Sequence, residues 1–200
     1  MTAAPRLRVF AAIELPAELA RRLSETIAEL SPRLPRQSLR WVRSEGVHLT
    51  LKFYGEVAPE RVPELQQLLQ TAAAAASPMS LAVGGLGVFP NPFRPRVLWT
   101  DMTGDLENLL ALQQAVDQAS APLGFPPEAR GFTPHLTLGR FKGSLRPPER
   151  EKLAAVVKDE RFARLGEFTA DSLSLMRSDL KPGGAVYTRL FAARLGSRNQ

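Results

Sequence analysis

The two histidines of the chain occur in the same tetrapeptide, His-Leu-Thr-Leu, which spans residues 48–51 and again residues 135–138. An imidazole has an ordinary pKa near 6.5, so one histidine can act as a base while another acts as an acid. The repeated motif therefore predicts paired acid–base chemistry by His48 and His135. A duplication whose chemistry has been lost is the structural alternative.

Strand geometry determines what each motif would present to a substrate. Successive side chains of a strand point to opposite faces, so His48 and Thr50 should share one face, as should His135 and Thr137. The intervening leucines would then face the core. Two such faces across a cleft would suit in-line displacement at phosphorus, where one imidazole deprotonates the attacking oxygen and the other protonates the leaving oxygen. Hydroxyls and arginines would neutralise the phosphoryl oxygens.

Other chemistries find little support in the residue types. The chain has no cysteine and only two histidines, a poor set for a zinc ion that takes four ligands, so we expect neither a metal nor a cofactor. Neither a G-x-S-x-G elbow nor a G-x-x-x-x-G-K-[ST] phosphate loop is present in the sequence. The run Gly84-Gly85-Leu86-Gly87 lacks dinucleotide-site spacing and predicts a bent strand end.

Strands and helices should alternate along the chain. We expect helices beginning near Pro16, Pro59, Asp105 and Pro147, and a turn over residues 179–184. Strands are expected at residues 7–13, 39–43, 47–54, 79–88, 96–100, 133–141, 168–177 and 185–195. This order is typical of an α/β or an α+β protein, and the repeat favours two pseudo-symmetric lobes; of the two classes we expect α+β. Each lobe would be a mainly antiparallel sheet with helices on its outer face, with the active-site cleft between the lobes of a single domain over residues 1–200.

Composition is that of a globular protein, and the positive net charge has two explanations, an anionic partner or the base composition of the genome. The 200 residues are 44% hydrophobic and 23% charged, with a net charge of +6. Arginine supplies 21 of the 26 cations, which suits phosphate binding but is also what a GC-rich genome produces. The longest uncharged span, residues 65–93, contains glutamine, glycine and proline, and the first 15 residues are too charged for a signal peptide. We expect a cytoplasmic monomer that does not bind membranes.

Several further segments accompany the two motifs, at residues 8–16, 47–55, 94–99, 130–138 and 182–187. With them the sequence resembles the two-histidine phosphoesterase superfamily, and within it the RNA 2′,3′-cyclic phosphodiesterase family, also called 2′-5′ RNA ligases. The resemblance implies metal-independent opening of a 2′,3′-cyclic phosphate, at RNA 3′ ends or in small nucleotides, to give a 2′-phosphate.

The resemblance also implies roles for single residues. His48 would be the proton donor and His135 the proton acceptor, while Thr50 and Thr137 would bind the phosphate. Two residues ahead of the second motif, Arg130 and Phe132, would contact the phosphate and the nucleotide. Gly131 stands where proline is common in the family, and Tyr54 stands where leucine is frequent.

Secondary site residues remain open between a functional and a structural role. Strand parity puts Lys52 and Tyr54 on the face of His48, where Lys52 could contact the phosphate and Tyr54 the nucleotide. A lysine at a strand end is more often simply exposed to solvent. Trp41 could stack on a base or belong to the core. Four arginines ahead of the first motif could guide an RNA end or form a solvated basic loop, namely Arg33, Arg36, Arg40 and Arg43.

Two alternatives to the hydrolase interpretation also stay open. The same four motif residues would serve a 2′-5′ RNA ligase, a 2′-5′ oligonucleotide phosphodiesterase or a small cyclic-nucleotide phosphodiesterase. A non-catalytic RNA-binding module that keeps the fold would carry the same pattern.

Overall fold

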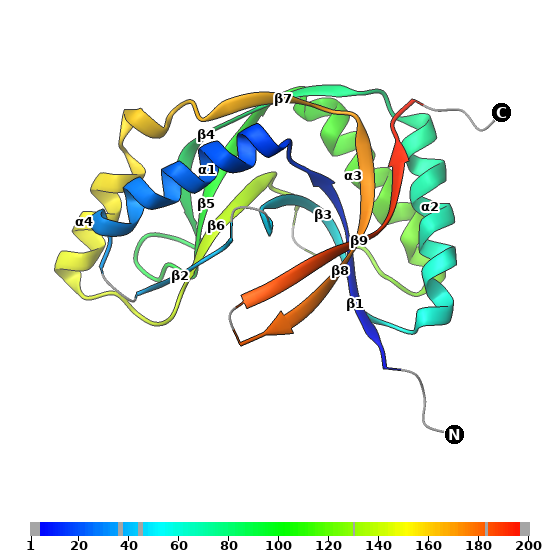
Figure 1. Ribbon diagram of the computed structural model, residues 1–200, viewed down its shortest axis with the longest axis horizontal. Coiled ribbons are helices and arrows are strands. Elements are labelled where there is room, and N and C mark those ends of the chain that lie inside the picture. The colour runs from blue at the N-terminus through cyan, green and yellow to red at the C-terminus, as the bar shows by residue number, and fades with distance from the viewer. Residues whose placement is uncertain (1–4, 36–37, 44–45, 130, 183, 197–200) are drawn as a thin grey trace.

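Two antiparallel sheets form the centre of the molecule in a computed structural model, which describes residues 5–35, 38–43, 46–129, 131–182 and 184–196. The first sheet has the order β3-β1-β8-β9, with β3 at His48–Val57, β1 at Leu7–Glu14, β8 at Ser172–Lys181 and β9 at Gly184–Arg194. The second has the order β2-β6-β5-β4-β7, with β2 at Leu39–Trp41, β6 at His135–Phe141, β5 at Val97–Gly104, β4 at Met79–Phe89 and β7 at Gly166–Ala170. Figure 1 shows the two sheets side by side.

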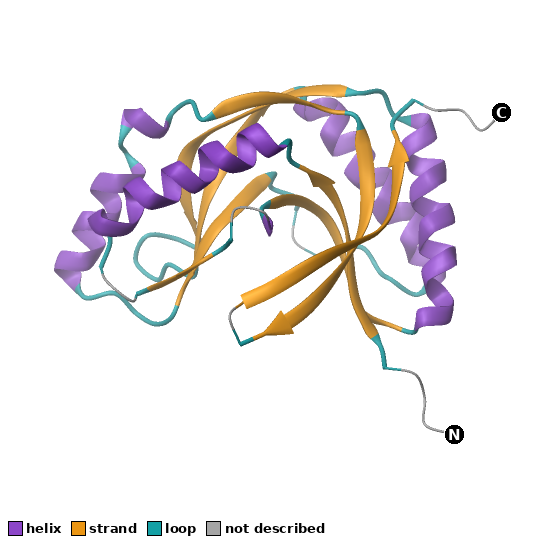
Figure 2. Cartoon of the chain, in the orientation of Figure 1, coloured by secondary structure: helices purple, strands orange, loops and turns teal. Residues whose placement is uncertain are grey.

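Helices cover the outer faces of the sheets (Figure 2). They are α1 at Ala17–Leu30, α2 at Val62–Ala75, α3 at Leu106–Ser120 and α4 at Pro147–Val157. The helices α2 and α3 lie against the first sheet, while α1 and α4 lie against the second. The predicted α+β class, with two mainly antiparallel sheets and helices outside them, is therefore confirmed. Within the described residues, no helix has the length and apolar character needed to cross a membrane.

Two helices cross from one sheet to the other. Helix α1 follows β1 of the first sheet but packs on β7 of the second, where the Leu19 side chain lies against Gly166. Helix α3 follows β5 of the second sheet but packs on β3 and α2. These crossings bind the two lobes together through one continuous hydrophobic cluster.

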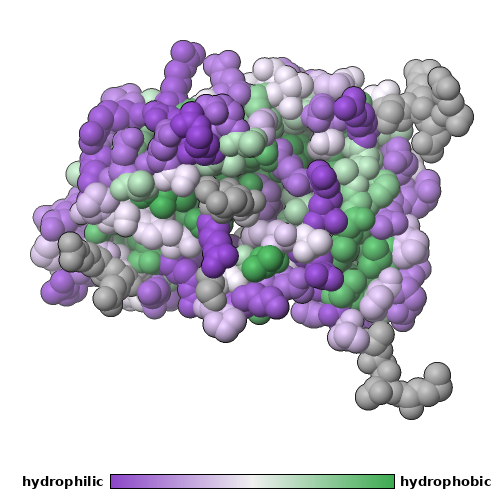
Figure 3. Space-filling view, viewed as in Figure 1, coloured by the Kyte–Doolittle hydropathy of each residue, from purple (hydrophilic) through white to green (hydrophobic). Residues whose placement is uncertain are grey.

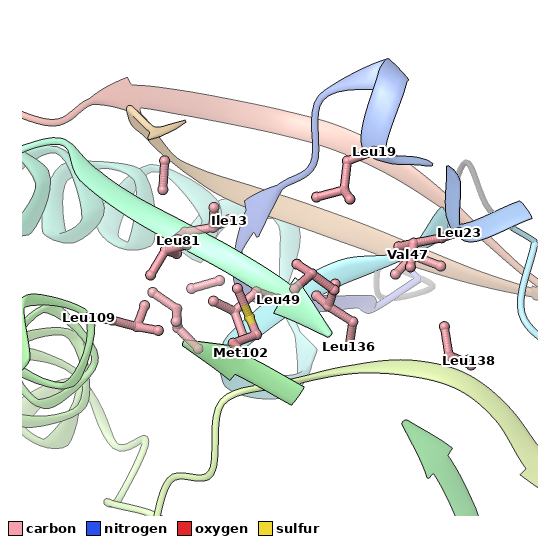
Figure 4. Packing of buried hydrophobic residues seen from close by; sticks show 14 of the residues in the cluster. Ile13, Leu19, Leu23, Val47, Leu49, Leu81, Met102, Leu109, Leu136 and Leu138 are labelled. Atoms are coloured by element: carbon pink, nitrogen blue, oxygen red, sulfur yellow. The ribbon is translucent and has the colours of Figure 1, made fainter. Parts of the chain in front are cut away.

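The leucines of the two motifs lie at the centre of this cluster. Leu49 and Leu136 are completely buried, and Figure 4 shows them close together beside Met102. Burying a leucine side chain contributes about 1.5–3 kcal/mol. The strands β3 and β6 belong to different sheets but lie next to each other, so the buried leucines join the two motifs on their inner side.

Three sequence expectations need correction. The expected strand at residues 168–177 is two strands, because the chain leaves β7 at Asp171 and enters β8 in the other sheet. The expected turn at residues 179–184 is mostly a hairpin, since β8 runs to Lys181 and Asp179 pairs with Val186. The glycine run is a bulge inside β4, with φ +72° at Gly85, and not a strand end.

Candidate active site

Each motif histidine is held by a backbone carbonyl two residues before it. The Nδ1–H of His48 donates to the carbonyl oxygen of Gly46 at 2.7 Å, and that of His135 donates to the carbonyl oxygen of Thr133 at 2.8 Å. A carbonyl can only accept, so Nδ1 carries the proton in both rings and Nε2 is the nitrogen left for chemistry. The two motifs therefore present their imidazoles in the same tautomer and with the same local support.

The expected alternation holds within each tetrapeptide. Leu49 and Leu51 are buried on β3, and His48 and Thr50 are partly exposed. The second motif repeats this on β6, where Leu136 and Leu138 are completely buried and His135 and Thr137 are partly exposed. Each strand thus has an imidazole and a hydroxyl on the face away from its leucines.

Aromatic rings enclose His48. The ring of Phe10 stacks on it with centroids 4.6 Å apart, and Tyr187 meets it edge-on at 4.8 Å. This burial lowers the pKa of His48 from 6.5 to about 4, although the hydrogen bond to Gly46 and the charge of Glu14 act in the opposite direction. His48 is therefore neutral at pH 7 in the free protein.

His135 has an aromatic wall of its own. Phe89 meets its ring edge-on at 5.0 Å and Trp99 at 6.1 Å, while Phe89 and Trp99 stack on each other at 4.8 Å. The indole lies directly over Gly87, where a Cβ would come within 2.2 Å of it. The absence of a side chain at Gly87 thus allows Trp99 to reach this position.

A bulge in β3 changes which residues follow Thr50 on the histidine face. Ala11 pairs with Lys52 and Ala12 with Thr50, so Leu51 is an extra residue that inverts the alternation. Lys52 is 1% exposed, bound to Asp117 and to the carbonyl oxygen of Pro126, so the parity placement of Lys52 was wrong. Phe53, in contrast, is 47% exposed.

Tyr54 is likewise not on the histidine face. It is buried against Phe125, with its hydroxyl oxygen accepting a hydrogen bond from Ser120 at 3.3 Å. Phe132 is partly buried and packs against the main hydrophobic cluster. Arg130, to which the resemblance assigned a phosphate contact, lies outside the described residues.

The arginines ahead of the first motif divide into two groups. Arg33 is bound to Asp159 at 2.6 Å and lies over Phe162, so its role is structural. Arg36 lies outside the described residues. Arg40 and Arg43 line a cavity of about 380 Å³ that Trp41 also borders.

This cavity adjoins the first motif and is formed by both sheets. Gly46, which binds His48, and Tyr187, which touches it, are among its walls. Arg140 of β6 and Arg8 of β1 line it from the second and the first sheet. It therefore marks one end of a cleft between the lobes.

Sequence reasoning missed the aromatic support of the site. Phe10, Tyr187, Phe89 and Trp99 received no role, although all of them except Phe89 lie in segments that carry the resemblance. Their positions beside the histidines depend on pairing between distant strands, which periodicity alone does not reveal. Across the described part of the chain, no three histidine, aspartate or glutamate side chains gather where they could hold a metal ion.

The sequence profile described as LigT-like phosphoesterase matches the chain in two stretches, residues 13–99 and 103–187, each containing one His-Leu-Thr-Leu motif. The chain belongs to this family. This LigT-like phosphoesterase is 32% identical over 193 residues to an RNA 2′,3′-cyclic phosphodiesterase of Methanothermobacter thermautotrophicus. The alignment covers 95% of this chain and 100% of the relative. A protein of the same name from Aquifex aeolicus is 30% identical, with 82% and 89% covered.

Solved structures resemble this LigT-like phosphoesterase over nearly its whole length. The protein TT0787 of Thermus thermophilus superposes with a TM-score of 0.77 at 27% identity, covering 96% of this chain and all of the other. E. coli LigT in complex with 3′-AMP superposes with a TM-score of 0.74 at 26% identity, covering 97% of this chain and all of the other. The two-sheet arrangement is thus that of the family.

Proposed function

We propose that the protein hydrolyses the 2′,3′-cyclic phosphate at an RNA 3′ end to a 2′-phosphate, using His48 as proton donor and His135 as proton acceptor. The observation that carries the proposal is the matched support of the two imidazoles, each with Nδ1 bound to a carbonyl and Nε2 left for proton transfer. The relatives named RNA 2′,3′-cyclic phosphodiesterase support the substrate class.

The reaction balances with these two groups alone. Water attacks phosphorus while Nε2 of His135 takes its proton, and the P–O3′ bond breaks as Nε2 of His48 gives a proton to O3′. The product has a 2′-phosphate and a free 3′-hydroxyl. The hydroxyls of Thr50 and Thr137 would donate hydrogen bonds to the non-bridging oxygens, with Arg130 adding charge and Phe132 contacting the nucleotide.

Burial of His48 places a condition on this assignment. A neutral imidazole cannot donate, and the pKa of His48 is about 4 in the free protein. An anionic phosphate next to the ring favours the charged imidazolium and raises its pKa. The proposal therefore requires that substrate binding itself protonates His48.

The direct test is incubation of an RNA oligonucleotide ending in a 2′,3′-cyclic phosphate, with and without a chelator. We expect a 2′-phosphate product under both conditions, and complete loss of turnover with chelator would contradict the metal-independent mechanism. His48→Ala and His135→Ala should each lower turnover by about 10² to 10⁴. If both variants keep RNA binding and their turnover equals that of the wild type, the histidines do not catalyse the reaction. That result would instead indicate a non-catalytic RNA-binding module.

A substrate panel separates the related enzyme activities. Cyclic-phosphate RNA, 2′-5′-linked dinucleotides and cyclic mononucleotides would be compared at equal concentration. The proposal expects the first to have the highest kcat/KM. Preference for the 2′-5′ linkage would instead identify a 2′-5′ ligase or phosphodiesterase that uses the same four residues.

A further inference from the structure

The cavity beside His48 is lined by an unusual combination of side chains. Four arginines border it, and none of the described residues in its wall is an aspartate or a glutamate. The arginines are Arg8, Arg40, Arg43 and Arg140. They come from both sheets and from the segment just after β2, so the positive charge is gathered across the mouth of the cleft.

Several other arginines of the molecule are already paired with carboxylates. Arg21, Arg61, Arg161 and Arg177 each form an ion pair with a neighbouring carboxylate. Among the described residues, the four cavity arginines have no carboxylate within ion-pair distance. Their guanidinium groups are thus left for an anion from solution, and a guanidinium binds a phosphate through two parallel hydrogen bonds.

Arg8 and Arg140 both lie close to one tyrosine that connects the cavity to His48. Burial raises the pKa of Tyr187, and the positive charges of Arg140 and Arg8 act in the opposite direction. The Tyr187 ring also meets the His48 ring at 4.8 Å. An anion held between these two arginines would therefore lie one aromatic ring away from the catalytic imidazole.

Aromatic surface accompanies the charge. Phe53 is 47% exposed and Trp41 is partly exposed, and both line the cavity. Aromatic faces interleaved with cations are the composition of single-stranded nucleic acid sites, where bases stack and phosphates pair with arginine. Figure 3 shows hydrophilic side chains over the region between the two sheets, with a few apolar ones among them.

We propose that this cavity binds the phosphodiester immediately 5′ of the cyclic-phosphate nucleotide, between Arg8 and Arg140, so that the protein selects oligonucleotides over cyclic mononucleotides. This inference rests on the proposed function, because the terminal cyclic phosphate must lie between the two histidines. From there, an RNA strand that continues past Tyr187 brings its next phosphate to the arginines. A cyclic mononucleotide has no group to place in this subsite.

The test compares two dinucleotides that differ only in charge. Both end in a 2′,3′-cyclic phosphate, but one has an ordinary phosphodiester linkage and the other a neutral methylphosphonate linkage. We expect the wild-type protein to favour the phosphodiester in kcat/KM by about tenfold, the scale of one charge-assisted phosphate contact. The slope of log kcat/KM against log salt should be steeper for the phosphodiester by about 0.7.

Arginine variants test whether the preference for the phosphodiester depends on the cavity. Arg8→Gln and Arg140→Gln should each reduce the phosphodiester-to-methylphosphonate ratio several-fold, and the double variant should bring it close to one. Arg21→Gln, an exposed arginine of α1, loses the same charge and should keep the wild-type ratio. The methylphosphonate substrate reports in each case whether the variant is folded and active.

The possible failures are distinguishable. A wild-type ratio near one, or a ratio unchanged in both cavity variants while turnover continues, would overturn the subsite and leave the proposed function intact. Absence of turnover with either dinucleotide and with the cyclic mononucleotide would overturn the proposed function, and the subsite with it.

Discussion

The ammonium group of Lys52 donates a hydrogen bond to the carbonyl oxygen of Pro126 at 2.9 Å. Lys52 lies two positions after Thr50 of the first motif, and Pro126 begins the segment that leads to the second. Asp117 of α3 completes the contact with an ion pair to the same ammonium group. A single buried cation therefore connects the strand of one histidine to the approach of the other.

Removing this cation should destabilise the protein strongly. Lys52→Met leaves Asp117 without its partner and should lower the free energy of unfolding by about 3–5 kcal/mol, the usual cost of breaking a buried pair. Urea denaturation would measure it. The double variant Lys52→Met/Asp117→Leu removes both charges and should recover most of the loss, whereas equal instability of single and double variants would contradict this role. Arg21→Met, in an exposed pair with Glu18, should change little.

His48 should make stability depend on pH. Its pKa is about 4 in the folded protein against 6.5 as the ordinary value, so between these pH values the unfolded chain binds the proton more readily. The free energy of unfolding should therefore fall as pH drops from 6.5 to 4, with up to about 3 kcal/mol from this residue.

Denaturation curves at pH 7 and pH 4.5 would show this contribution. His48→Gln should lose less stability over that interval than the wild type, because its glutamine has no proton to gain. His135→Gln is the same change in the other motif and leaves His48 in place. Its free energy of unfolding should therefore still fall between pH 7 and pH 4.5 by the amount that His48 contributes. Parallel pH dependence in the wild type and in His48→Gln would show that the pKa of His48 is not lowered.

The pH profile of kcat/KM should be bell-shaped, since one imidazole must be charged while the other is neutral. Activity falls at high pH because the acid must be protonated in the reacting complex. If His48 is the donor, His48→Ala should therefore lack the alkaline limb of its residual activity and keep the acid limb. His135→Ala should do the reverse. Loss of only the acid limb in His48→Ala would mean that the donor and acceptor roles are exchanged.

Gly87→Ala should disturb the second motif from a distance. The added methyl group would come within 2.2 Å of the Trp99 ring, which supports the His135 ring. Overpacking of this kind costs about 1–3 kcal/mol, and the displaced indole should lower kcat/KM and change the tryptophan fluorescence. Gly143→Ala is the matched control, because its methyl group would meet no atom within 4 Å. If Gly87→Ala has wild-type activity, Trp99 does not support His135 in the way that we infer.

Local sequence was sufficient for the centre of each motif. Leucine at alternate positions predicted the core face, and Leu49 and Leu136 are indeed completely buried. The two histidines could be assigned to one site from the sequence because the chain has no other histidine.

Residues just beyond the motif could not be placed in this way. Alternation past Thr50 would put Lys52 outward, but the bulge at Leu51 turns it into the core and brings Phe53 outward instead. A bulge depends on how β3 pairs with β1, and the partner of Thr50 in β1 is Ala12, which is 38 residues earlier in the chain. For the same reason the segment at residues 168–177 gave no sign that it is divided between two sheets at Asp171.

The strand order of the first sheet has a consequence for how the chain reaches its native state. Strand β1 is synthesised before both of its neighbours in the sheet, since it lies between β3 and β8, and β8 begins only at Ser172. During synthesis the β8 edge of β1 therefore stays without its partner until the chain has been made past Ser172. Contacts at such sequence separation slow folding, and an open apolar strand edge invites pairing with other chains. Nascent chains that stop short of β8 should be the form of this protein most prone to aggregate.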